Sequence, residues 1–80
     1  MIIDVTLPRF GVHMYSAYVG VWLKAAGDRV VQGEPLVDIE TEKATGTVEA
    51  PAAGVLVEIL VQSEGEARVG QIIARIRADG

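Results

Sequence analysis

Few side chains in this sequence could act as nucleophiles or general bases, because it contains two lysines, one histidine and no cysteine. Lys24 follows an alternating apolar segment, whereas Lys43 lies at a polar bend between two alternating segments. A modifying enzyme can reach the amine of a lysine on such a bend while the domain stays folded. His13 has no nucleophile or orienting acid beside it, and no thiolate is present, so we expect neither a catalytic residue nor a metal site.

The neighbours of Lys43 decide how this lysine is interpreted. A turn lysine close to glutamates is in most proteins a solvated residue that forms weak surface ion pairs. Around Lys43, however, Glu42 offers a charge to a partner, and Ala44 leaves one side of the lysine uncrowded. If Lys43 is covalently modified, Glu42 and Ala44 are the residues that the modifying enzyme would recognise; the wider sequence around Lys43 must decide between a modified and a solvated lysine.

Length and charge narrow the class of protein. Eighty residues form one domain with a modest core, too small for a large internal active-site cleft. A formal net charge of −4 without a basic cluster argues against binding to nucleic acid or to an anionic membrane, so the expected partners are proteins. Residues 1–7 resemble a strand and not a targeting signal. We expect a cytoplasmic protein, or one of the mitochondrial matrix if the chain is a mature eukaryotic one.

Apolar and polar side chains alternate through most of the chain, and glycine or proline turns separate the alternating segments. β-Branched residues recur in these segments, which favours strands over helices. The segments expected to be strands are residues 3–7, 19–24, 30–31, 36–40, 44–49, 55–61 and 72–76. This spacing predicts an all-β sandwich or small barrel, with Lys43 at the tip of a hairpin and a long loop over residues 9–16.

The sequence also contains an internal repeat. Residues 27–39 (GDRVVQGEPLVDI) align with residues 65–76 (GEARVGQIIARI) if the first copy carries one extra residue, which pairs Gly27 with Gly65. Chance similarity between two glycine-punctuated strands is the alternative. A duplication predicts two four-stranded halves related by an approximate two-fold axis, with Lys43 on the connection that follows the first copy. Positive φ angles are expected at glycines 27, 33, 54, 65 and 70.

The segment DIETEKATGTVEAPAAG, residues 38–54, resembles the attachment motif of lipoyl domains, which belong to the biotinyl/lipoyl-attachment family. Lys43 matches the lysine of that motif, with its preceding acidic residue and following alanine. Further matches extend over nearly the whole chain, at Leu7-Pro8, Val21-Trp22-Leu23-Lys24, Gly27-Asp28, Gly54 and Val69-Gly70-Gln71. The resemblance implies a flattened barrel-sandwich hybrid of two four-stranded antiparallel sheets, with both termini in one sheet and the lysine turn in the other.

The resemblance also implies a function, that of a non-catalytic lipoyl carrier in the acyltransferase (E2) chain of a 2-oxo acid dehydrogenase complex. Lipoate would be joined to Lys43 as an amide by lipoate ligase or by a lipoyl/octanoyl transferase. The implied partners are a thiamine-diphosphate-dependent dehydrogenase (E1), the acyltransferase core (E2) and dihydrolipoamide dehydrogenase (E3). We expect residues 1–77 to form the carrier domain and residues 78–80 to begin a linker.

The loop over residues 9–16 departs from the family pattern. In the family this loop lies near the lysine turn and helps the dehydrogenase to recognise its carrier, so its expected recognition residues here are Arg9, Phe10, His13 and Tyr15. Phe10 and Trp22 are also expected to pack against apolar neighbours.

Two other functions stay open. A biotin carrier has a similar fold but usually places methionine on both sides of its lysine, which Glu42 and Ala44 do not match. An unmodified barrel-sandwich module that joins proteins would tolerate Lys43→Arg without loss of function.

Overall fold

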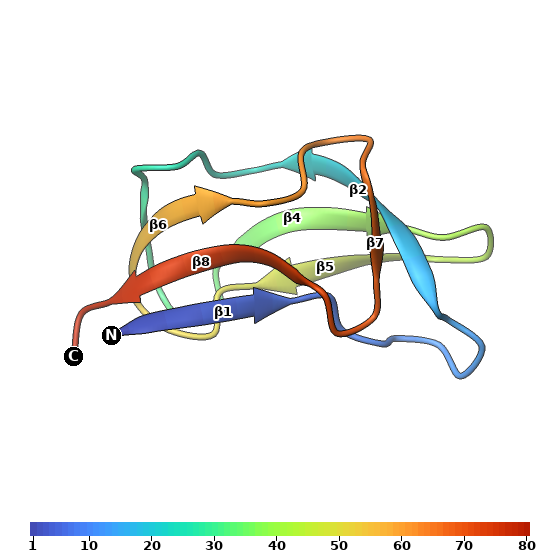
Figure 1. The fold of residues 1–80 in the computed structure, drawn as a ribbon, viewed down its shortest axis with the longest axis horizontal. Helices are drawn as coiled ribbons and strands as arrows, with labels where there is room; N and C mark the ends of the chain where they lie inside the picture. Colours follow the sequence, from blue (N-terminus) through green and yellow to red (C-terminus); the bar gives the residue numbers. More distant parts are fainter.

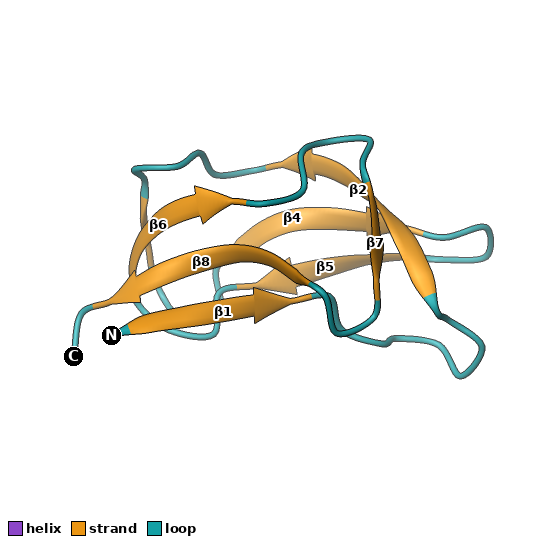
Figure 2. Cartoon of the chain, in the orientation of Figure 1, coloured by secondary structure: helices purple, strands orange, loops and turns teal.

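The computed structural model describes residues 1–80 and contains eight strands and no helix. The strands are β1 (Ile2–Thr6), β2 (Ser16–Trp22), β3 (Arg29–Val30), β4 (Pro35–Glu40), β5 (Thr45–Glu49), β6 (Gly54–Ile59), β7 (Glu66–Arg68) and β8 (Ile72–Ala78). They form two four-stranded antiparallel sheets, with the orders β1-β8-β6-β3 and β5-β4-β2-β7. Figure 2 shows that loops connect the strands at both ends of the molecule. The predicted flattened all-β sandwich is confirmed.

The two sheets enclose one apolar core. Seventeen buried residues form it, all of them apolar, and Leu36, Ile39, Leu56, Ile73 and Ile76 are among the largest that are fully buried. Trp22 packs against this cluster and donates a hydrogen bond from Nε1 to the carbonyl oxygen of Val61, at 2.8 Å. The indole therefore has a structural role, as the sequence predicted.

The termini and the Lys43 hairpin lie at opposite ends of the molecule. β1 pairs with β8, with Ile2 opposite Arg77, so both chain ends leave from the same edge region. The β4–β5 hairpin projects from the other end, at the right of Figure 1. Any chain that continues beyond either terminus therefore starts on the side away from Lys43.

The internal duplication is visible in the hydrogen bonds. The amide of Gly27 donates to the carbonyl of Leu56 at 2.6 Å, and the amide of Glu64 donates to the carbonyl of Val19 at 2.7 Å. The two donors, Gly27 and Glu64, lie 37 positions apart in the sequence, and so do the two acceptors, Val19 and Leu56. The sheet orders agree, because β5, β4, β2 and β7 occupy the places that β1, β8, β6 and β3 occupy in the other sheet. The predicted two-fold relation between the halves is confirmed.

The alignment within the repeat needs one correction. Gly27 is equivalent to Glu64 and not to Gly65, because both Gly27 and Glu64 adopt positive φ angles, of 99° and 73°. Gly33 and Gly70, with φ angles of 84° and 88°, are also 37 positions apart. The first copy therefore carries no extra residue between these points.

Gly54 and Gly65 do not have positive φ, so that prediction is wrong at both positions. At Gly54 the reason for glycine is space, since a Cβ there would lie 2.1 Å from the carbonyl oxygen of Arg77 on the neighbouring strand β8. At Gly65 a Cβ would lie 2.8 Å from Cγ1 of Val61. Close packing, and not backbone conformation, excludes larger side chains at these two sites.

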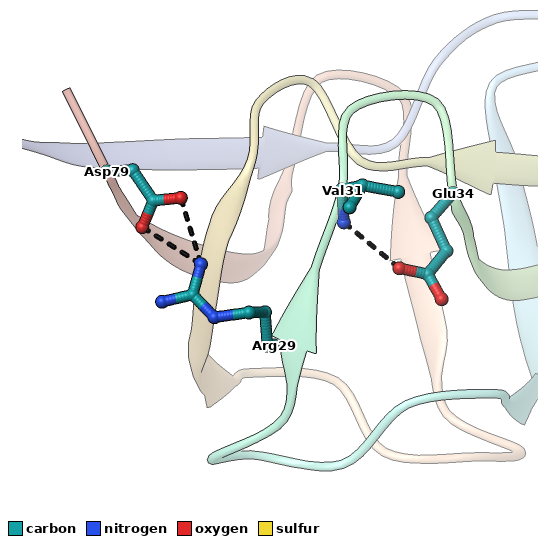
Figure 3. A network of polar contacts seen from close by, with 4 residues as sticks. All are labelled: Arg29, Val31, Glu34 and Asp79. Carbon is teal, nitrogen blue, oxygen red and sulfur yellow. Dashed lines mark hydrogen bonds and ion pairs between the residues drawn. The ribbon is translucent and has the colours of Figure 1, made fainter.

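The turns before β4 and β8 are closed in the same way. Oε1 of Glu34 accepts a hydrogen bond from the amide of Val31 at 3.0 Å, as Figure 3 shows. Oε1 of Gln71, 37 positions later, accepts one from the amide of Arg68 at 2.9 Å. The two halves have thus kept the same side-chain closure with different residues.

The last residues of the chain contact the domain. β8 continues to Ala78, and both carboxylate oxygens of Asp79 lie near Nη1 of Arg29, at 2.9 and 3.1 Å (Figure 3). A division between domain and linker at residue 77 stays a prediction.

Candidate functional site

Lys43 lies on the four-residue loop that joins β4 to β5. Glu40 is paired with Thr45 across the hairpin, and residues 41–44 cross between the strands. Glu42, Lys43 and Ala44 are all exposed. The predicted position of the lysine, at the tip of a hairpin, is confirmed by this geometry.

Thr41 holds the loop in shape, and sequence reasoning missed it. Its Oγ1 accepts hydrogen bonds from the amides of Ala44 at 3.1 Å and Lys43 at 3.4 Å. The same hydroxyl donates to the carbonyl oxygen of Ala44 at 3.1 Å, and the amide of Thr41 donates to that oxygen at 2.9 Å. A threonine at the start of a short loop is the available sequence signal, because its hydroxyl can bond to nearby backbone groups. The backbone that carries Lys43 is therefore fixed, while its side chain extends into solvent.

The two lysines differ in the state of their amines. Nζ of Lys24 forms an ion pair with Oε2 of Glu34 at 2.9 Å, and both side chains are about three-quarters buried. The hydrogen bond from Lys24, together with that from the Val31 amide, lowers the pKa of Glu34 below its ordinary value of 4.5. The Nζ amine of Lys43 takes part in no ion pair or hydrogen bond; only its backbone amide is bonded, to Oγ1 of Thr41. Of the two lysines, only Lys43 presents a free side-chain amine.

An open groove lies between the Lys43 loop and the connection from β1 to β2. One wall is formed by residues 40–44 and the other by residues 10–18, with Glu66 of β7 at the margin. Its volume is about 620 Å³. Three predicted recognition residues, Phe10, His13 and Tyr15, line this groove together with Lys43. The long loop is thus placed beside the modification site.

Arg9 is the predicted recognition residue that does not line the groove. Its guanidinium lies over the ring of Tyr15, with Cζ 5.5 Å from the ring centroid, which is within the range of a cation–π contact. Arg9 therefore contacts the groove through Tyr15. Tyr18, on β2, lines the groove and was not among the residues singled out in the sequence.

Phe10 joins the long loop to the hairpin. A Cβ built at Gly46, on β5, would lie 3.1 to 3.2 Å from three atoms of the Phe10 ring, so the ring covers the glycine directly. The amide of Phe10 points at Sδ of the buried Met14, at 3.4 Å. The packing role predicted for Phe10 is therefore confirmed, and its partner is the strand that follows Lys43.

The fold and the lysine can now be compared with known proteins. The family model described as "Biotin-requiring enzyme" (biotin/lipoyl) matches residues 3–76. The chain therefore belongs to the biotin/lipoyl attachment family.

The structure has no helix long and apolar enough to span a membrane.

Curated relatives place the chain among the lipoyl members of this family. It is 40% identical over 73 residues to the dihydrolipoyllysine-residue acetyltransferase component of the pyruvate dehydrogenase complex of Corynebacterium glutamicum. This match covers 91% of this chain and 11% of that protein. It is 41% identical over 76 residues to the succinyltransferase component of the 2-oxoglutarate dehydrogenase complex of Cupriavidus necator, covering 94% and 18%. The chain thus spans less than a fifth of the length of these two relatives.

Solved structures agree with this placement. The lipoyl domain of the 2-oxoglutarate dehydrogenase complex from Azotobacter vinelandii superposes with a TM-score of 0.79 and 32% identity, covering 98% of this chain and 99% of that one. Urea carboxylase of Kluyveromyces lactis also superposes, with a TM-score of 0.80, but at 22% identity over 6% of its length it shows only the shared fold. Together these similarities define a lipoyl-type carrier domain and favour it over a biotin carrier.

Proposed function

We propose that Lys43 carries a lipoyl group in amide linkage and that the domain presents this group to the active sites of a 2-oxo acid dehydrogenase complex. The observation that carries the proposal is the free amine of Lys43 at the tip of a hairpin whose backbone Thr41 holds in place. The relatives that support the lipoyl group are acyltransferase components with lipoyllysine in their names. The site fits an amide-linked group, because nothing in the domain competes for the amine.

The lipoyl group supplies a disulfide that can be reduced, acylated and re-oxidised; the residues of this chain supply attachment, reach and recognition. Amide formation removes one positive charge and changes the formal net charge from −4 to −5. Glu42 and Ala44 flank the amine and are proposed to be read by the lipoate ligase or the lipoyl/octanoyl transferase. Phe10, His13 and Tyr15, with Arg9 over the ring of Tyr15, are proposed to contact the dehydrogenase.

The partners are the three enzymes of such a complex: a thiamine-diphosphate-dependent dehydrogenase, an acyltransferase core and dihydrolipoamide dehydrogenase. Because the carrier is tethered to the complex, each active site meets the lipoyl group at an effective concentration set by the tether and not by diffusion. The domain therefore needs no catalytic residue of its own. The relatives include components of pyruvate dehydrogenase, 2-oxoglutarate dehydrogenase and acetoin-cleaving systems, and all three are candidates for the complex.

Intact mass after incubation with purified ligases tests the proposal. With lipoate ligase, ATP and lipoate, we expect one lipoyl-sized adduct on the wild-type chain and on Lys24→Arg, and none on Lys43→Arg. With biotin ligase and biotin, we expect no adduct. A biotin adduct alone would move the chain to the biotin carriers, and no adduct from either active ligase would contradict a carrier function.

A further inference from the structure

Exposed apolar side chains gather in the groove beside Lys43. The exposed fractions of Val12, Tyr15 and Tyr18 are 81%, 69% and 56%, and all three residues line the groove that Lys43 also lines. Single exposed apolar residues are ordinary on a protein surface, but a gathered set around a hollow indicates a binding site. The occupant of this groove is either a group attached to Lys43 or a molecule that binds from solution.

The groove is already formed in the unmodified chain. Phe10 is held against Gly46 of β5, and Arg9 lies over Tyr15 within the same loop, so the loop that forms one wall is anchored to the hairpin and braced internally. Thr41 fixes the opposite wall through its hydrogen bonds to Lys43 and Ala44. Binding to a preformed groove avoids the entropic cost of ordering its walls.

The charges around the groove favour an occupant without negative charge. Glu40, Glu42 and Glu66 line it, and His13 and Lys43 are the only lining residues that can carry a positive charge. Once Lys43 is an amide, its charge is lost, and the three carboxylates outnumber His13 and the guanidinium of Arg9, which lies over Tyr15. A carboxylate or phosphate ligand would be repelled, whereas an uncharged alkyl chain ending in a cyclic disulfide would not.

We propose that the lipoyl group attached to Lys43 folds back into this groove and rests its apolar chain and disulfide ring against Val12, Tyr15 and Tyr18. This inference rests on the proposed function, because it needs a lipoyl group on Lys43. The tether places the ligand at an effective concentration in the millimolar range, so an intrinsic dissociation constant of the same order keeps the groove about half occupied. The resting disulfide is then partly shielded, and a partner that binds the loop releases it.

Amide resonances test whether the arm contacts the groove. Spectra of the isotope-labelled 80-residue chain are compared in three forms: unmodified, lipoylated at Lys43, and carrying Nε-acetyl-lysine at position 43. The acetyl form is the matched control, because it loses the same charge without gaining the long arm. We expect resonances of Val12, Tyr15 and Tyr18 to shift in the lipoyl form and not in the acetyl form. Identical shifts in the two modified forms would overturn the proposal.

The rate at which a water-soluble phosphine reduces the disulfide provides a second readout. About half occupancy predicts that the lipoylated chain is reduced roughly twofold more slowly than free lipoamide. Tyr15→Ser should bring the rate toward that of lipoamide, whereas Val31→Ser, at a residue outside the groove that is 59% exposed, should leave it unchanged. Equal rates for the wild-type chain, Tyr15→Ser and lipoamide would overturn the proposal.

The two proposals fail in distinguishable ways. The lipoyl adduct is confirmed by mass before either measurement begins, so a missing adduct contradicts the proposed function. A chain that is lipoylated but shows neither the groove shifts nor the slower reduction contradicts only the docking of the arm.

Discussion

A Cβ atom at Gly46 would lie 3.1 Å from Cε1 of Phe10, so the aromatic ring occupies the space that any other residue at position 46 would need. This contact joins the long loop after β1 to the strand that follows Lys43. No positive φ requires glycine at position 46, and the glycine is therefore explained by the ring. The shape of the groove depends on this pair.

The pair can be tested by a double-mutant cycle. Gly46→Ala should lower the free energy of unfolding by about 1 kcal/mol, because the added methyl group crowds the ring. In a Phe10→Ala background the same substitution should cost less, since the ring is gone. Urea unfolding of the four chains measures both values. Equal costs in the two backgrounds would show that Phe10 and Gly46 are not coupled.

Thr41 provides the second prediction. Thr41→Val removes the hydroxyl that bonds to both amides and to the carbonyl in the Lys43 loop, and should cost about 1 kcal/mol of stability. Because the loop then loses its fixed shape, the rate of lipoylation should fall, whereas Thr41→Ser should retain most of it. The measurement is the initial rate of adduct formation by mass. A Thr41→Val chain that is modified at the wild-type rate would show that loop shape does not matter to the ligase.

Gly54 should be far less tolerant of an added side chain than Gly11. A methyl group at this position would lie 2.1 Å from the backbone oxygen of Arg77, so β6 and β8 must separate to admit it. Gly54→Ala is expected to cost about 3 kcal/mol or more, at the upper end of overpacking effects. Gly11→Ala, where the nearest atom outside the adjacent residues is 3.9 Å away, is the matched control. Similar unfolding midpoints for the two variants would contradict the close approach of the strands.

The Lys24–Glu34 ion pair predicts a dependence of stability on pH. The pKa of Glu34 in the folded chain lies below its ordinary value of 4.5, mainly because Lys24 donates a hydrogen bond to the carboxylate. The stabilisation is therefore complete above about pH 4.5 and is lost as the pH falls through the lowered pKa.

Glu34→Gln isolates this effect. Glutamine can still accept from the Val31 amide, as Gln71 does from the Arg68 amide at the equivalent turn, but it carries no charge. Chemical unfolding between pH 3 and pH 7 should show a smaller loss of stability for Glu34→Gln than for the wild-type chain. Parallel profiles would mean that Glu34 contributes nothing to the acid dependence.

Local patterns in the sequence predict much of this fold. Alternation identifies the two strands around Lys43, because one face of each is buried, and the repeat predicts the paired arrangement of the sheets. The long loop was expected to extend to Ser16, but β2 begins at that residue, where Ala17 is buried and pairs with Ala67. β7 was not expected, since three residues with a single buried alanine give no clear alternation.

The parts that were missed depend on contacts between distant residues. The groove is formed by segments about 30 positions apart, and no local pattern places Tyr18 beside Lys43. The reason for glycine at positions 46 and 54 likewise lies in a neighbour from another strand or loop. The sequence shows that these positions are glycine, but only the packed structure shows which atom excludes a side chain.

The most direct test of the central claim is a tryptic map of the chain isolated from cells that lipoylate their own carriers. Trypsin does not cleave after an acylated lysine, so modification at Lys43 should yield one peptide of residues 30–68 with a single lipoyl-sized addition, and unmodified Lys24 should be cleaved normally. This is the result that we predict. Complete cleavage into residues 30–43 and 44–68, with no addition on either peptide, would contradict the assignment of Lys43 as the lipoyl carrier.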